Sequence, residues 1–157
     1  MNISEILNKG AVSVNLTAAS KDDMLSELVD LLVSSKSVRK ADKPEILKRL
    51  KEREVLGSTG IGKGVAIPHA KCSKVKKMTA AFGVSKKGVD FKSLDGQSTF
   101  IFFTLIAPGE TPGPHLKALA KISRLLDDRF IRERLRSAKS DNDILSIIRS
   151  EEKKSGS

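Results

Sequence analysis

The chain has 157 residues, of which 39% are hydrophobic and 31% charged, and its formal net charge at pH 7 is +10. No apolar run approaches the roughly 18 to 20 residues of a membrane helix, residues 1–6 lack the layout of a signal peptide, and the single cysteine, Cys72, excludes an internal disulfide. We therefore expect a cytoplasmic protein with a single domain over residues 1–150 and a disordered tail over residues 151–157.

The positive charge by itself suggests a nucleic-acid partner. Basic residues cluster in residues 36–53, 71–77 and 124–136, but acidic residues such as Glu52 and Glu133 are mixed among them. Interspersed charges are typical of solvated helix faces. The chain also has no Trp or Tyr, and none of its Phe residues lies in an RNA-stacking pattern. Nucleic-acid binding is therefore disfavoured as the main role.

The first third of the chain is predicted to form one strand and two helices. Residues 11–16 alternate between apolar and polar like a short strand. Ser20, with Asp23 three residues later, has the pattern of a helix N-cap, and apolar residues follow it at helical spacing. Asp42 and Glu45 repeat this pattern for a second helix, which tolerates Pro44 in its first turn and ends near residue 53.

The remainder alternates between loops, strands and helices. Glycine-rich residues 55–64 are predicted to form a loop, followed by an extended segment before Pro68. Residues 98–107 are apolar on both faces, which indicates a central strand covered by helices on both sides. A second strand is predicted at 78–84, a turn-rich connection at 88–96, a Gly/Pro-rich loop at 108–114, and helices at 116–126, 129–138 and 141–149, the last capped by Asp141. This order predicts an α/β fold in which helices flank a mixed sheet.

The glycine-rich loop resembles a nucleotide site only in part. Residues 57–63 satisfy the first seven positions of the Walker A pattern, but Gly64 stands where that pattern requires Ser or Thr. A Walker loop also follows a buried strand and opens a helix, whereas this loop follows a charged helix and runs into Pro68. A nucleotide-hydrolysing P-loop is therefore disfavoured, although the glycines and the hydroxyls of Ser58 and Thr59 still suit an anion.

The only two histidines, His69 and His115, each follow one of the irregular loops. Imidazole titrates near neutral pH, so a histidine can act as an uncharged nucleophile and then hold or release a phosphoryl group. Each could also be an ordinary surface residue. A metal site is disfavoured, because Cys72 has no second thiol beside it and the histidines have no carboxylate at ligand spacing.

The segment from Arg53 to His69, REVLGSTGIGKGVAIPH, resembles the signature of enzyme IIA domains of the bacterial phosphotransferase system, in the fructose/mannitol branch that includes nitrogen-regulatory homologues. Residues 89–96 resemble the middle section of that family, and residues 114–126 resemble the helix that carries its second histidine. The resemblance extends over nearly the whole chain and implies a five-stranded mixed sheet flanked by helices on both sides.

The resemblance also implies a phosphotransferase function without a cofactor or metal. His69 would accept phosphate on Nε2 from an HPr-type phosphohistidine protein, or from its nitrogen-branch relative, and pass it to an enzyme IIB. By the same resemblance, Arg53 and His115 would lie beside His69. Arg53 would offer a planar fork for phosphate oxygens, and His115 a hydrogen-bond donor. Ser58, Thr59 and Gly60 are weaker candidates for phosphate binding.

Two features of the function stay open at this point. A standalone nitrogen-regulatory protein, which signals by phosphorylation-dependent binding to a target protein, is the alternative to a role in sugar uptake. The family implies a basic face around the histidine of HPr, which a chain of charge +10 does not complement. We therefore expect a locally apolar or acidic docking face, centred near Ile61 and Pro108.

Overall fold

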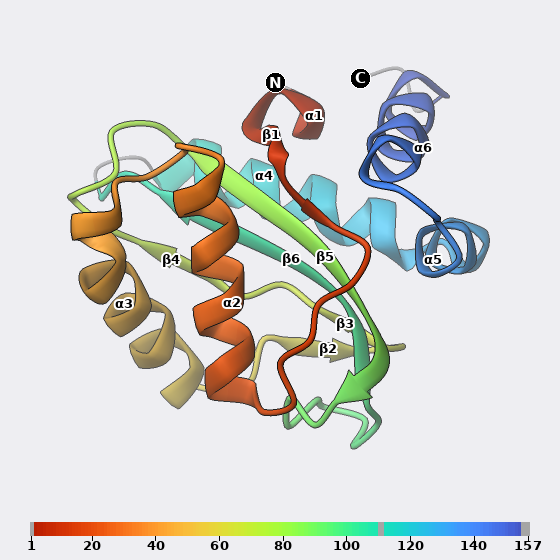
Figure 1. Cartoon of the computed structure of the whole chain (residues 1–157), viewed down its shortest axis with the longest axis horizontal. Helices are drawn as coiled ribbons and strands as arrows, with labels where there is room; N and C mark the ends of the chain where they lie inside the picture. The colour runs from red at the N-terminus through yellow and green to blue at the C-terminus, as the bar shows by residue number, and fades with distance from the viewer. Residues whose placement is uncertain (1, 110–111, 155–157) are drawn as a thin grey trace.

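The computed structural model of the protein describes residues 2–109 and 112–154. Along the chain, a short helix and a strand are followed by two longer helices, then by five strands and finally by three helices (Figure 1). The helices are α1 (Ile3–Ile6), α2 (Lys21–Ser34), α3 (Lys43–Val55), α4 (Pro112–Asp127), α5 (Arg129–Arg136) and α6 (Asp141–Lys154), with a 3-10 turn, η1 (Lys40–Asp42), before α3. The strands are β1 (Leu7–Ser13), β2 (Gly60–Gly62), β3 (Val65–Ala66), β4 (His69–Lys71), β5 (Thr79–Val89) and β6 (Thr99–Ala107).

The strands form one mixed sheet in the order β1-β5-β6-β3-β2, with β4 also paired to β6. β5 and β6 are antiparallel, whereas β1 is parallel to β5, and β3 and β4 are both parallel to β6. β3 and β4 lie along the same edge of β6 and are separated by Ile67 and Pro68. The sheet of five strands implied by the resemblance is therefore found, with one of its positions divided into two short strands.

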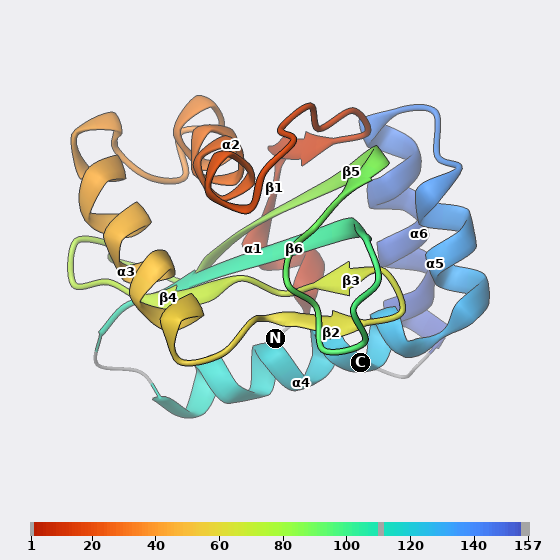
Figure 2. The ribbon, with the colours of Figure 1, turned by 90° about the horizontal axis from the view of Figure 1, so that it is seen from below.

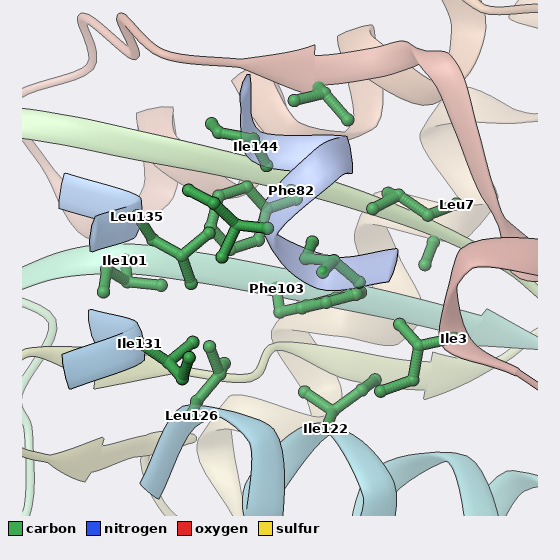
Figure 3. Close-up of a cluster of buried hydrophobic side chains, with 14 of the residues drawn as sticks. Ile3, Leu7, Phe82, Ile101, Phe103, Ile122, Leu126, Ile131, Leu135 and Ile144 are labelled. Carbon is green, nitrogen blue, oxygen red and sulfur yellow. The ribbon is translucent and has the colours of Figure 1, made fainter. Parts of the chain in front are cut away.

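Helices cover both faces of the sheet, as the apolar pattern of residues 98–107 predicted. In Figure 2, α2 and α3 lie on one side of the sheet and α4 on the other, with α5 and α6 at the end away from α3. One core cluster joins the sheet to α1, α4, α5 and α6 and contains Phe82, Phe103, Ile122, Leu135 and Ile144 (Figure 3). The second joins the opposite face to α2 and α3 through Met24, Leu28, Ile46, Leu50 and Phe102. β6 contributes to both clusters, which confirms it as the central strand.

The C-terminal end of the chain differs from the expected disordered tail. Residues 151–154 continue α6, and Glu152 is buried with 6% of its surface exposed. Its carboxylate accepts hydrogen bonds from the backbone N–H groups of Ile3 and Ser4 at the start of α1. This carboxylate satisfies N–H groups that the helix itself leaves unpaired, so these residues are held by the opposite end of the chain. Residues 155–157 lie outside the described residues.

Several predicted caps and loop limits were also wrong. The Ser20 hydroxyl accepts a hydrogen bond from the Asp23 N–H and caps α2 as predicted. At the start of α6, the capping hydroxyl is that of Ser140, which accepts from the Asp143 N–H, and not the side chain of Asp141. Asp42 is the N-cap residue of α3, but its side chain makes no capping hydrogen bond, because its carboxylate is held by the guanidinium of Arg39. The first glycine-rich loop contains the short strand β2, and α4 already begins at residue 112, so the second loop is shorter than predicted. Residues 110 and 111 of that loop lie outside the described residues.

Within the described part of the chain, no helix combines the length and the apolar character needed to cross a bilayer.

Candidate functional site

Arg53, His69 and His115 line a single open pocket of about 480 Å³. Arg53 lies in the last turn of α3, His69 begins β4, and His115 lies in the first turn of α4. These three elements meet at one end of the sheet in Figure 2, although they are far apart in the sequence. The other lining residues are Arg49, Glu52, Leu56, Ala70 and Lys71.

The two histidine rings are neighbours. Their centroids are 5.5 Å apart and their planes are tilted by 50°. His69 is half-buried and faces the pocket from the sheet edge, whereas His115 has only 5% of its surface exposed. The Nδ1 atom of His115 has no hydrogen-bond partner among the described residues.

The ring of His69 is oriented by its own backbone. Its Nδ1 atom lies 2.7 Å from the carbonyl oxygen of Ile67. A carbonyl can only accept a hydrogen bond, so Nδ1 must carry the proton in this contact. In the neutral ring, Nε2 then keeps its lone pair and is the nucleophilic atom. The hydrogen bond thereby favours the same nitrogen that the family resemblance implied.

The backbone that supplies this carbonyl is held from both sides. The N–H of Ile67 donates to the Thr59 carbonyl at 3.0 Å. The Pro68 carbonyl accepts from the N–H of Leu105 at 2.9 Å and from the hydroxyl of Thr104 at 2.8 Å. Thr104 is fully buried and was not predicted as a site residue. The signal that could have identified it is a single hydroxyl within the otherwise apolar run of β6 after residue 99.

Both histidines are biased towards the neutral state. Burial lowers the pKa of His69 below its ordinary value, the hydrogen bond to Ile67 opposes this change, and the charge of Arg53 adds to it. Burial lowers the pKa of His115 to about 4, with smaller contributions from His69 and Lys71. At neutral pH the pocket therefore presents two uncharged imidazoles beside the permanent charge of Arg53.

Arg53 and its neighbour Glu54 connect the end of α3 to the glycine-rich loop. The Nη1 atom of Arg53 donates to the Gly57 carbonyl at 2.8 Å. Glu54, which the sequence analysis did not single out, accepts from the Thr59 N–H at 3.0 Å and pairs with Lys21 at 2.9 Å. The Thr59 hydroxyl also donates to Glu54. The sequence signal that could have identified Glu54 is an acidic residue placed between Arg53 and the glycine-rich loop.

The structure does not bring Ser58, Thr59 or Gly60 into the pocket. The Ser58 hydroxyl donates to the Phe91 carbonyl at 2.7 Å and accepts from the Gly60 N–H at 3.0 Å. Thr59 is buried against Glu54 with 3% of its surface exposed. In this structure the hydroxyls shape the loop, and a role in phosphate binding stays a prediction.

Comparison with known proteins places this architecture among phosphotransferase-system IIA domains. Residues 5–151 match the family model for "Phosphoenolpyruvate-dependent sugar phosphotransferase system, EIIA 2". The chain belongs to this family, whose members are components of a phosphotransferase.

Relatives from both branches of the family are similar to the chain. It is 38% identical to the fructose-specific EIIABC component of Bacillus subtilis over 98% of its own length, but it spans only 24% of that protein. It is 35% identical to a nitrogen regulatory protein of Bradyrhizobium diazoefficiens, with 94% of this chain and 95% of the relative covered. The crystal structure of nitrogen regulatory protein IIA-Ntr from Neisseria meningitidis superposes with a TM-score of 0.85 and 32% identity, over 93% of this chain and 98% of the other.

Proposed function

We propose that this protein is a phosphocarrier of the phosphoenolpyruvate-dependent phosphotransferase system, with His69 as the residue that is transiently phosphorylated. The observation that carries the proposal is the 2.7 Å contact between His69 Nδ1 and the Ile67 carbonyl, which leaves Nε2 as the nucleophile in a pocket shared with Arg53 and His115. The donor is a phosphohistidine carrier of the HPr type or its nitrogen-branch relative. The acceptor is an enzyme IIB.

The transfer needs no proton movement at His69. The Nε2 lone pair attacks the phosphorus of the carrier's phosphohistidine, whose other ring nitrogen is protonated. The new Nε2–P bond forms as the carrier's N–P bond breaks, and the bonding electrons return to the carrier's imidazole, which leaves neutral. The His69 ring becomes cationic and keeps its proton on Nδ1, where the hydrogen bond to the Ile67 carbonyl becomes charge-assisted and stronger.

Arg53 and His115 act on the phosphoryl group in this scheme. Phosphoryl transfer depends mainly on positioning and on donors for the equatorial oxygens. Arg53 supplies a planar cationic donor at the pocket wall. His115 is neutral beside neutral His69, and the negative charge of an attached phosphoryl group raises its proton affinity. A proton taken up by His115 then stabilises the phosphorylated state, and its loss favours onward transfer.

Apolar side chains at the edge of the pocket support docking of a protein partner. Leu56 lines the pocket and is 82% exposed, and Leu116, next to His115, is 65% exposed. Exposed apolar groups of this kind mark protein interaction sites. An apolar contact region accommodates a basic carrier in spite of the net charge of +10. Ile61, which the sequence analysis favoured, is 45% exposed but does not line the pocket.

The test is phosphorylation in a defined mixture of phosphoenolpyruvate, enzyme I and either HPr or the nitrogen-branch carrier. We expect one phosphate per chain that is labile in acid and stable in alkali. His69→Ala should take up none, whereas His115→Ala should keep some phosphorylation but pass it on more slowly. Phosphate uptake by His69→Ala would contradict the proposal.

A regulatory role is the second candidate, because the nitrogen regulatory relative aligns over almost its whole length. In that case phosphorylation of His69 controls binding to a target protein rather than sugar uptake. Addition of a fructose-type or mannitol-type enzyme IIB to the phosphorylated protein separates the two roles. Rapid loss of phosphate to IIB supports transport, and phosphorylation only by the nitrogen-branch carrier, with no loss to IIB, supports regulation.

A further inference from the structure

A second cavity, of about 630 Å³, lies away from the histidine pocket. It is formed where the connection from α2 to α3 passes beside the loop between β4 and β5 (Figure 1). α3 begins next to this cavity and ends at the histidine pocket, and a helix of this length spans about 20 Å. None of the described residues lines both cavities. We call it the basic cavity, after the residues that surround it.

The charge around the basic cavity is strongly one-sided. Its lining contains six cationic side chains: Lys36, Arg39, Lys40, Lys74, Lys76 and Lys77. Asp42 is its one acidic lining residue among those described, and Arg39 already holds it through contacts of 3.0 and 3.1 Å. The ion pairs found within the described residues include none of the five lysines, although Lys74 is near enough to help lower the pKa of Asp42. Like charges gathered around one cavity repel one another, so a bound anion relieves this repulsion.

The floor of the basic cavity is apolar. Val75 is buried, and Val33 and Val38 are half-buried beneath the cationic rim. An inorganic anion gains nothing from such a floor, whereas a ligand with an apolar body does. The volume also falls within the range of roughly 300 to 1,000 Å³ that is typical of small-molecule sites. Charges that surround a cavity, rather than follow a long face, favour a small ligand over a nucleic acid.

We propose that the basic cavity binds a small organic polyanion with an apolar body, of the class of the nucleoside di- and triphosphates. The base and sugar pack against the three valines, and the phosphate chain lies among the lysines. The proposal does not depend on phosphoryl transfer at His69, and either can fail without the other.

Lys36 provides a substitution that should leave the fold intact. It follows the C-cap of α2 with a φ of 61°, in the left-handed region that glycine adopts most easily. Lys36→Gly therefore removes a cation of the cavity and relieves backbone strain at the same position. Lys92 has a φ of 55° and lies in the connection between β5 and β6, so Lys92→Gly is a matched control that removes the same charge elsewhere.

The experiment is isothermal titration calorimetry of the whole chain with ATP, GTP and UTP at low ionic strength, about 0.05 M. We expect a single site for at least one of the three nucleotides, and binding at least about tenfold weaker for adenosine and for inorganic phosphate. Lys36→Gly should weaken nucleotide binding by about fivefold, and Lys36→Gly combined with Lys76→Gln by considerably more. Lys92→Gly should bind like the unchanged protein.

Three results would overturn the proposal. One is the absence of heat with all three nucleotides, and another is equal weakening by Lys36→Gly and Lys92→Gly. The third is a single-stranded oligonucleotide that binds more tightly than the nucleotides and is weakened equally by Lys36→Gly and Lys92→Gly. This result would indicate a diffuse charge effect rather than a built site.

Discussion

The Nδ1 atom of His69 donates a hydrogen bond to the carbonyl oxygen of Ile67, two residues earlier in the chain, over 2.7 Å. This contact sets the tautomer of the His69 ring without help from another side chain. The carbonyl lies in the break that Ile67 and Pro68 form between β3 and β4, while both of these strands remain paired with β6. We therefore expect the reactivity proposed for His69 to depend on the integrity of β6.

Thr104 should matter for both stability and transfer, because its hydroxyl holds the Pro68 carbonyl at 2.8 Å. Thr104→Val keeps the shape of the side chain but removes this donor, so we expect a loss of about 1 kcal/mol in the free energy of unfolding. Phosphorylation of His69 should also become slower.

Thr99 on the same strand is the control, because its buried hydroxyl has no hydrogen-bond partner among the described residues. Thr99→Val should be neutral or stabilising. Urea unfolding of the two variants measures the difference, and equal losses would contradict the assignment.

Arg53 should contribute to the rate of transfer through its fork geometry. We expect Arg53→Gln to slow phosphorylation of His69 by about 100-fold, which corresponds to about 3 kcal/mol for one preorganised donor. Arg53→Lys should recover only part of the rate, because lysine keeps the charge but not the planar pair of donors. Lys51→Gln, an exposed change on the same helix, controls for the loss of one positive charge. Single-turnover transfer from the phosphorylated carrier is the measurement. If the rate of Arg53→Gln lies within a factor of about two of the control rate, Arg53 only holds the loop through Gly57 and does not assist transfer.

His115 should make the stability of the protein depend on pH. Its pKa is about 4 in the folded protein, against an ordinary value of 6.5. Between these two values the unfolded chain binds more protons than the folded one, so folding becomes less favourable as the pH falls. The contribution of neutral His115 to the free energy of unfolding is fully present above pH 6.5 and is lost progressively towards pH 4. We expect a loss on the order of 1 to 3 kcal/mol over this window. Urea unfolding at several pH values measures how steeply the free energy of unfolding changes with pH, and this slope should be smaller for His115→Gln. An unchanged slope would show that His115 takes up no proton when the chain unfolds.

Leu56 should act on partner binding rather than on the chemical step. Leu56→Gln replaces an apolar side chain that is 82% exposed at the pocket edge with an uncharged polar one, and we expect the KM for the carrier to rise by about tenfold. The stability should hardly change, because the residue is exposed. Phe130 on α5 is a suitable control, since it is 74% exposed and α5 lies at the end of the sheet away from α3 (Figure 2). A similar KM increase in Phe130→Gln would show that the effect is not specific to the pocket edge.

The sequence predicted most of the secondary structure, because the relevant signals are local. The Ser20 cap, the apolar spacing of α2 and the doubly apolar run of β6 each depend on residues within a few positions of one another. The cap at Asp141 was wrong, because Ser140 caps α6 from one residue earlier. Asp42 does take the N-cap position of α3, but its carboxylate binds Arg39 rather than a backbone N–H group. Residues 151–154 were misjudged for a related reason, since their composition does not reveal that Glu152 meets the start of α1.

For the site, the residue pattern singled out His69 and His115 as candidates, and the resemblance added Arg53 and predicted that all three lie together. The residue pattern also predicted an α/β sheet covered on both faces, since periodicity records which residues face a core. Tertiary structure decided that the two rings lie 5.5 Å apart, that Ile67 and Thr104 orient His69, and that Ser58 and Thr59 turn inwards to shape the loop. These relationships join segments as much as 46 residues apart, by the numbering of His69 and His115. Their distances and hydrogen-bond partners exist only once the helices have packed against β6, and no local pattern in the chain encodes them.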